Sequence, residues 1–328
     1  MGKYLKIFKT LNDYNNFIST QSSNIPVISL VQENKNVFFG MVQHSMMQHN
    51  ELCKSLNYIK FTAIDNSSVS LNSHEPINIK YSFDCKTWID WDLQPILLNS
   101  GDSVYMKGNN QQGFNSSAKI DADRYNQFVI LGKTQCSGNI MSLLYEDDFE
   151  NKYNIDIEYC FANVFKNCED LVTAPELPAT KISAGCYYAM FEGCTSLQKT
   201  PDLPATQLES SCYSCMFNNC TSLLETPILP ATVVSVGCYL AMFMNCTNIT
   251  TVNDIFAKYL EIGTCMNMFN GCKNLNKITM WATNIYENDC LETWVSNVSP
   301  TGKFVKYKDT NFEIGVNGIP EGWEIENI

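Results

Sequence analysis

The strongest constraint on the fold of this chain is a block of sequence that recurs every 26 residues. The segments CYYAMFEGCTSL, CYSCMFNNCTSL and CYLAMFMNCTNI begin at residues 186, 212 and 238 and align without a gap. The tetrapeptide LPAT recurs with the same step, first at 177–180. A period of this length means that each copy is one supersecondary unit, which buries its apolar face only against its neighbours. The sequence therefore predicts an array of stacked repeats.

Weaker copies extend the array in both directions, at 160–171, 264–275 and 289–298. Ten of the fifteen cysteines fall into two columns of the aligned copies. The first column holds Cys160, Cys186, Cys212, Cys238 and Cys290, and the second holds Cys168, Cys194, Cys220, Cys246 and Cys272. Cysteine packs as a small, soft apolar side chain, so these columns indicate a narrow core instead of independent reactive sites. We expect reduced thiols, although disulfides between neighbouring copies are sterically open.

Each copy combines two local patterns. Cys186, Met190 and Cys194 are spaced four residues apart, and Tyr187 and Phe191 follow the same spacing, which predicts one stripe of a helix or of successive helical turns. The following segment, TPDLP at 200–204, contains two prolines that suit an extended, edge-like strand. We therefore expect a coil of short strand, turn and helical segment.

The repeat motif resembles a known family. Its pattern is Phe, two residues, Cys, two residues, Leu, and then a Pro-rich strand. It resembles the BspA-like leucine-rich repeats, the Treponema-type class found in bacterial surface proteins and in proteins of phages that infect gut Bacteroidales. The resemblance covers about 155–298 and implies a leucine-rich-repeat solenoid. The end of the chain, 297–328, resembles the terminal cap of such arrays, with 304–308 and 322–328 expected to pair as a final hairpin.

The first half of the chain has no repeat. Short β-branched and aromatic runs at 58–63, 77–83, 103–107 and 128–131 predict strands of an antiparallel sandwich. This part resembles the β-domain that often precedes such repeats, and 1–50 resembles a small leader that docks onto a larger assembly.

The predicted fold is mixed α+β in four parts. They are an N-terminal docking segment at 1–55, a β-sandwich-like domain at 56–150, a solenoid of 26-residue coils at 151–298 and a C-terminal β cap at 299–328.

Composition argues against several functions. The net charge is −12, and Arg124 is the one arginine of the sequence, so we expect no nucleic-acid partner. The longest mostly apolar run, 233–244, is far below the ~20 residues that span a bilayer, and the sequence as given holds no signal peptide. No histidine lies in 75–328 to accompany the repeat cysteines, so we expect no catalytic residue, no metal site and no cofactor.

Binding is expected where the repeat varies. Eight positions in two columns change from copy to copy while their neighbours stay fixed: Thr173, Glu176, Lys199, Asp202, Glu225, Ile228, Thr251 and Asp254. In stacked repeats such columns face outwards and form an extended binding strip.

Three functional hypotheses follow. The first is a non-enzymatic structural and recognition protein of a phage virion, a fibre, tail or capsid decoration within a multi-chain assembly. It would contact other virion proteins through its N-terminal region and a host surface glycan or protein through the repeats. The second is a bacterial cell-surface adhesin. The third is a carbohydrate-active enzyme with its site in the β-domain, where Asp90, Asp92 and Asp148 are the carboxylates to test.

Overall fold

The computed structural model describes residues 5–8, 28–33, 36–41, 57–115, 125–285, 287 and 289–328. The chain divides into two compact units, Met1–Ser55 and Leu56–Ile328. In the first unit β1 (Leu5–Phe8) runs parallel to β2 (Ile28–Glu33), and β2 runs antiparallel to β3 (Asn36–Met41). The docking role predicted for 1–55 falls mostly outside the described residues. The division of the rest into three parts stays a prediction.

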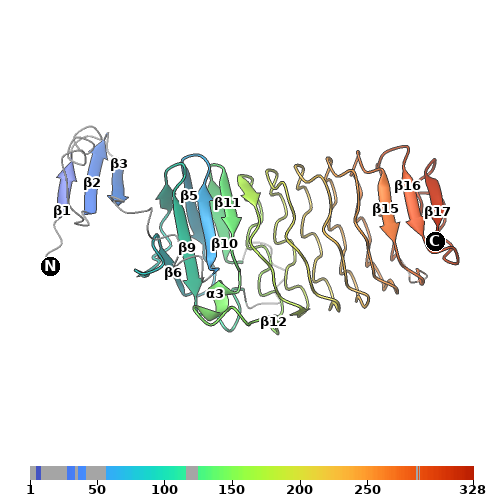
Figure 1. Ribbon diagram of the computed structural model, residues 1–328, viewed down its shortest axis with the longest axis horizontal. Helices are drawn as coiled ribbons and strands as arrows, with labels where there is room; N and C mark the ends of the chain where they lie inside the picture. Colours follow the sequence, from blue (N-terminus) through green and yellow to red (C-terminus); the bar gives the residue numbers. More distant parts are fainter. Residues whose placement is uncertain are drawn as a thin grey trace. The chain divides into compact units, whose positions relative to one another are not determined.

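Two sheets open the second unit (Figure 1). One has the strand order β10 (Gln127–Leu131), β5 (Ser67–Asn72), β8 (Ile96–Leu98). The other has the order β13 (Leu171–Thr173), β11 (Thr134–Ser137), β4 (Ile59–Ala63), β9 (Ser103–Gly108), β6 (Ile79–Ser82), β7 (Ile89–Asp90). The four runs predicted as strands in this part are strands. One short helix, α3 (Ser142–Tyr145), follows them.

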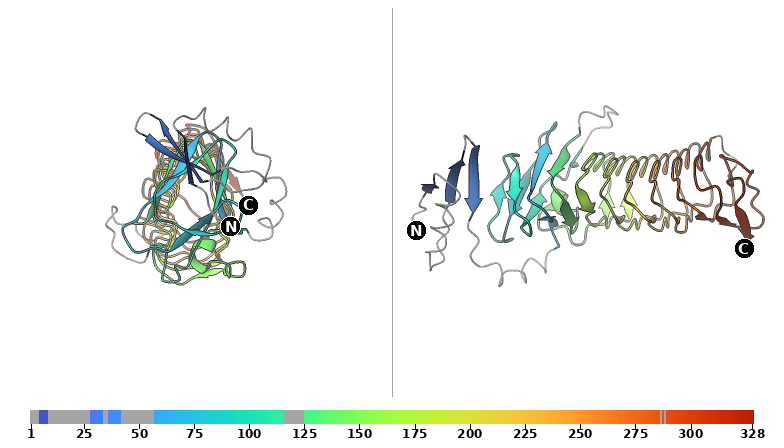
Figure 2. Two further views of the ribbon diagram at one scale, coloured as in Figure 1. Left: turned by 90° about the vertical axis from the view of Figure 1, so that its left-hand side faces the viewer. Right: turned by 90° about the horizontal axis from the view of Figure 1, so that it is seen from above.

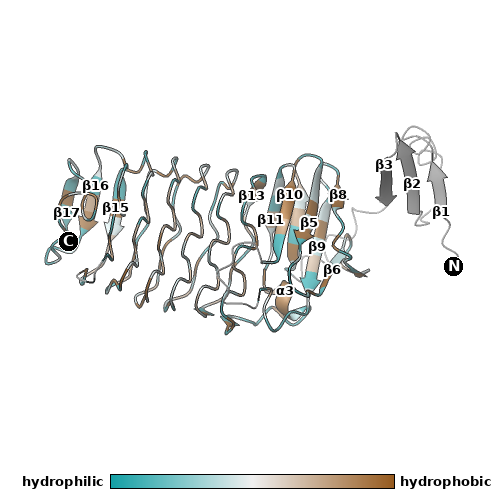
Figure 3. Cartoon of the chain, turned by 180° about the vertical axis from the view of Figure 1, so that it is seen from behind, coloured by the Kyte–Doolittle hydropathy of each residue, from teal (hydrophilic) through white to brown (hydrophobic). Residues whose placement is uncertain are grey.

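The two sheets share a core because their strands alternate buried and exposed side chains. In β4, for example, Ile59, Phe61 and Ala63 are buried and the residues between them are not. The ring of Phe61 lies 5.1 Å from that of Phe128 on the other sheet. Figure 3 shows apolar and polar residues mixed along these strands, as expected for strands with one buried face.

The repeats begin as a continuation of the larger sheet, because β13 of the first copy pairs in parallel with β11. The copies then follow one another side by side (Figures 1 and 2). Hydrogen bonds join each copy to the next at every second residue. Phe161, Asn163 and Phe165 donate their N–H groups to carbonyls 25 residues further along the chain, at 2.9 Å each.

The segment between the two cysteine columns is a series of tight turns. Residues that do not bond the next copy close turns instead, as Ala162 and Lys166 do by donating to the carbonyls three residues before them. Every fourth residue has a positive φ, for example Ala189 at 49° and Gly193 at 75°. This left-handed conformation interrupts an α-helix and frees the backbone to bond the neighbouring copy.

The prediction of a mixed α+β fold, with a β-sandwich-like domain followed by a capped leucine-rich-repeat solenoid, is wrong. The described structure is nearly all β, 2% helical and 26% strand, in several small sheets, none of which is closed or forms a solenoid. Cys186, Met190 and Cys194 do point inwards and are buried. The helix was expected because four-residue turns repeat an inward position with the same spacing as a helix face.

Ring stacks and thiols fill the core of the repeats. Phe165, Phe191, Phe217, Phe243 and Phe269 form one column, with ring centroids 5.4 to 5.8 Å apart and planes within 11° of parallel. All ten column cysteines are buried free thiols. The expectation of reduced thiols therefore holds for the repeats, while Cys85, outside them, is disulfide-bonded.

Short strands lie among and after the copies. β12 (Asn154–Ile155) pairs with β14 (Lys181–Ile182), and β15 (Lys277–Met280), β16 (Lys303–Lys306) and β17 (Glu324–Asn327) form a last sheet. The segments expected to form a terminal hairpin do pair, but β16 and β17 run parallel. An antiparallel hairpin was therefore the wrong prediction, because the connection between the two strands is a crossover instead of a tight turn.

Candidate functional site

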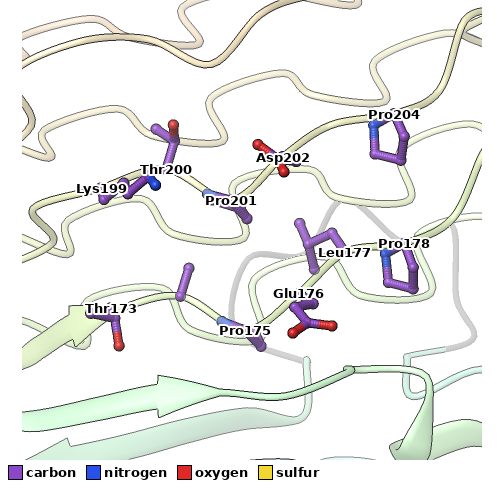
Figure 4. A pocket seen from close by; sticks show the side chains of 11 residues that line it. Thr173, Pro175, Glu176, Leu177, Pro178, Lys199, Thr200, Pro201, Asp202 and Pro204 are labelled. Atoms are coloured by element: carbon purple, nitrogen blue, oxygen red, sulfur yellow. The ribbon is translucent and has the colours of Figure 1, made fainter. Parts of the chain in front are cut away.

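A groove of about 490 Å³ lies where two Pro-rich segments of consecutive copies run side by side. It is lined by residues from 173–178 and 199–204. Figure 4 shows the two segments one above the other, with their labelled side chains around the space between them. Thr173, Glu176, Lys199 and Asp202, four of the eight predicted binding residues, line this groove.

The prolines explain why the two segments leave a groove. Before them the backbones approach closely, and Gln198 N donates to Val172 O at 3.2 Å. Pro201 and Pro204 have no N–H group and cannot continue a hydrogen-bonded ladder.

Later copies show the effect of replacing these prolines. Asn253 and Phe256 stand where earlier copies have proline. There, Phe256 N donates to Leu229 O at 3.1 Å, and Asn253 N donates to Thr226 Oγ1 at 2.9 Å. Neighbouring segments are therefore hydrogen-bonded again at the positions where a residue with an N–H group replaces proline.

The groove combines an apolar floor with charged walls of both signs. Leu177 and Pro201 are buried, whereas Glu176, Lys199 and Asp202 are exposed. Asn57 Nδ2 donates to Glu176 Oε2 at 2.6 Å, which fixes one wall. Among the described residues, neither Lys199 nor Asp202 has an ion-pair partner within 4.0 Å. The groove therefore offers free donors and acceptors to a polar ligand with an apolar face.

The other four predicted residues lie in the corresponding places of the next two copies and do not line this groove. Glu225 is bridged in parallel to Thr251, as Thr173 is to Lys199. Ile228 is exposed. Asp254 Oδ1 accepts a hydrogen bond from Trp281 Nε1 at 3.0 Å. The binding role of these residues stays a prediction.

Sequence reasoning missed the proline column itself as part of the site. Pro178 and Pro204 line the groove, and the same column of the aligned copies continues as Pro230 and Phe256. The rings of Phe256 and Trp281 stack at 6.0 Å with planes 2° apart, and the Tyr307 ring lies 5.2 Å beyond Trp281. The signal was present in the aligned copies, where a fixed proline gives way to Phe256.

A buried lysine in the first part of the unit was also missed. Lys107 Nζ lies 2.6 Å from Asp147 Oδ1 and 4.4 Å from the centre of the Trp88 ring. Tyr58 OH donates to the same carboxylate. Burial opposes ionisation of Asp147, but the hydrogen bonds from Lys107 and Tyr58 outweigh it and lower the pKa of this carboxyl. The hydrogen-bonding groups of Tyr58, Lys107 and Asp147 are partners of one another, so we interpret the cluster as a part of the packed interior.

The three carboxylates considered for a glycosidase are exposed, and two of them interact with residues close in sequence. Asp148 forms an ion pair with Lys152 at 3.0 Å, and Asp92 accepts a hydrogen bond from the N–H of Gln94 at 3.1 Å. Asp90 is exposed on β7. Their role in catalysis stays a prediction.

Burial raises the pKa of the repeat thiols. Desolvation raises the pKa of Cys160, Cys168 and Cys272 to about 12, and that of Cys238 to about 11. Such thiols stay protonated at neutral pH, and the thiol form is a poor nucleophile and metal ligand.

Two further observations bear on the site. Within the described ranges, no group of three or more His, Cys, Asp or Glu side chains is arranged to hold a metal ion. No helix among the same residues has the length and apolar character needed to cross a membrane.

In comparisons with known proteins, no family model matches the chain, and no match is found among curated proteins or solved structures.

Proposed function

We propose that the chain is a non-enzymatic structural and recognition protein of a phage virion, serving as a fibre, tail or capsid decoration. It attaches to a host surface glycan or protein through the Pro-rich face of its repeats. The observation that carries this proposal is the groove between 173–178 and 199–204, whose shape comes from fixed prolines and whose charges come from variable residues.

The construction of the repeats suits recognition. Stacked rings and hydrogen bonds from copy to copy hold the backbone in place, so a ligand would find a preformed surface. Residues such as Lys199 and Asp202 project from this scaffold and can change without disturbing it. The virion setting is supported by the resemblance of the repeat motif to repeats of Bacteroidales phages. In that setting the N-terminal region contacts other virion proteins.

The groove is tested by exchanging its charges. A fluorescently labelled full-length chain is added to Bacteroidales cells and to their isolated envelopes, and bound protein is measured across a concentration series. The variant Lys199→Glu/Asp202→Lys keeps the net charge and changes only exposed side chains. We expect it to bind at least ten-fold more weakly than the unmodified chain.

A matched control exchanges charges elsewhere. Lys181 and Asp156 form an ion pair at 3.0 Å whose side chains are 68% and 69% exposed, outside the groove. The variant Lys181→Glu/Asp156→Lys should bind as the unmodified chain does. Equal binding by both variants contradicts the proposed role of the groove, and turnover of a bound glycan contradicts the non-enzymatic assignment.

A further inference from the structure

An exposed apolar cluster lies on a different part of the repeats. Val233, Val236, Tyr259 and Ile262 are between 44% and 63% exposed. They occupy the same two columns in consecutive copies. Lys258 N donates to Thr232 O at 3.4 Å and Gly237 N donates to Ile262 O at 3.2 Å, so the two copies are in contact on both sides of the cluster. Exposed apolar side chains gathered in this way mark interaction surfaces.

The next copy continues this cluster with an acidic groove. Leu260 N donates to Asn284 O at 3.0 Å, and Cys265 N donates to Cys290 O at 2.9 Å, which places the two copies side by side. A groove of about 320 Å³ opens there. Its lining includes four carboxylates, those of Glu287, Asp289, Glu292 and Glu313.

These four carboxylates lack compensating charges. Among the described residues, none of them has a cationic side chain within 4.0 Å. They also do not converge on a point that could hold a metal ion. Their negative potential is therefore spread along the groove, which suits several separate cations and not one bound ion.

We propose that the apolar cluster and the acidic groove form one docking surface for a protein segment in which a run of apolar side chains is followed by a run of Lys or Arg side chains. Charge complementarity selects this occupant. A second copy docked through this same surface would bring carboxylates against carboxylates, and a nucleic acid would be repelled by the same charges. This inference rests on the proposed function only in that the chain works within a larger assembly.

The test uses a labelled octapeptide of four Leu followed by four Lys residues, whose fluorescence anisotropy is measured as the unlabelled full chain is added. The variants are Val236→Ser/Tyr259→Ser in the apolar cluster and Glu292→Gln/Glu313→Gln in the groove. We expect each to weaken binding at least five-fold. The control is Leu97→Ser on β8, whose side chain is 57% exposed and outside the surface, and it should leave binding unchanged.

Two further probes separate this surface from general attraction to an acidic protein. An octapeptide of four Ser followed by four Lys residues should bind at least five-fold more weakly than the Leu–Lys peptide, and one of four Leu followed by four Glu residues should not bind. Equal binding of the Leu–Lys and Ser–Lys peptides, or equal effects of the surface variants and the control, overturns the proposal. Cell adsorption by the charge-exchanged groove variant is measured separately, so failure of one proposal is distinguishable from failure of the other.

Discussion

At the scale of single residues, the second cysteine column does something that a hydrocarbon side chain cannot. Each of its thiols is buried and donates a hydrogen bond to a backbone carbonyl of the segment packed before it. Cys194, Cys220 and Cys246 donate to the carbonyls of phenylalanines in the copy before, at 3.0 Å each. The sequence could predict that these cysteines are core residues, but not that their S–H groups bond the neighbouring copy.

Removing one such thiol should destabilise the chain locally. Cys220→Ala loses the hydrogen bond to Phe191 O and leaves a small cavity, so we expect a loss of roughly 1–2 kcal/mol in the free energy of unfolding. Urea denaturation measures this loss. Cys215→Ala is the control, because Cys215 lies outside both columns and is only partly buried, and it should change stability by less than about 0.5 kcal/mol. Equal losses would refute the structural role of the column.

The buried thiols also predict instability in alkali. Burial raises the pKa of Cys160 and Cys168 to about 12, whereas an unfolded cysteine titrates near its ordinary value of 9.0. Because the folded pKa is the higher one, this stabilisation is complete below about pH 9. It is then lost as the pH rises towards 12.

Linkage sets the size of this loss. Each such thiol removes about 1.4 kcal/mol of stability per pH unit in this range. Urea midpoints measured under argon between pH 7 and 10 should therefore fall steeply above pH 9. A constant midpoint across this range would contradict the burial of the thiols as free groups.

At the scale of elements, a four-residue turn takes the place of the expected helix. The inward spacing of Cys186, Met190 and Cys194 was predictable, because a helix and a series of four-residue turns both place every fourth residue in the core. The turns themselves were not, since residues such as Ala189 have no intrinsic preference for a positive φ. Their conformation is stabilised by hydrogen bonds between copies, as Ala189 N donates to Ser214 O at 2.8 Å. A single copy considered alone does not contain that information.

The groove, too, could be predicted from the sequence only in part. The variable positions of the groove could be predicted from the aligned copies, including Lys199 and Asp202. The opening of the groove could not, because it depends on hydrogen bonds that Pro201 and Pro204 fail to make with a neighbouring segment.

One turn position tests the close approach of neighbouring copies. Gly193 has a φ of 75°, and a Cβ added there would lie 2.4 Å from Asn167 Oδ1 of the preceding copy. Gly193→Ala should cost roughly 1–2 kcal/mol from backbone strain, and more than Gly101→Ala because the Asn167 amide must move away from the added Cβ. Gly101→Ala is the matched control, because its φ is 86° and nothing lies within 4 Å of the added Cβ. Thermal denaturation compares the two, and an equal cost at both positions would show that the copies do not approach so closely.

At the scale of the whole molecule, an ion pair joins the first sheets to the repeats. Lys133 Nζ lies 2.7 Å from Asp170 Oδ1 and 2.6 Å from Ser196 Oγ of the next copy. The hydrogen bond from Lys133 lowers the pKa of Asp170; burial opposes this effect, and the N–H of Gly132 assists it. The junction therefore links three segments through one cation.

This junction predicts a dependence of stability on acid. Because the folded pKa of Asp170 is the lower one, its stabilisation is present above the unfolded value of about 4 and is lost as the pH falls through the folded value. Asp170→Asn should cost about 1 kcal/mol at pH 7, a figure reduced for the partial exposure of the pair. The difference from the unmodified chain should narrow at pH 3 in urea denaturation. Asp156→Asn, at an exposed pair, should have no measurable effect, and an unchanged difference at pH 3 would contradict the assignment.

We have proposed that this chain is a virion protein that recognises a host surface. Mass spectrometry of purified virions and of separated host-cell envelopes tests this proposal most directly. We expect peptides of this chain in the virions, in a fixed ratio to capsid or tail proteins. Peptides found only in the cell envelopes would contradict it and would favour an adhesin that uses the same repeat surface.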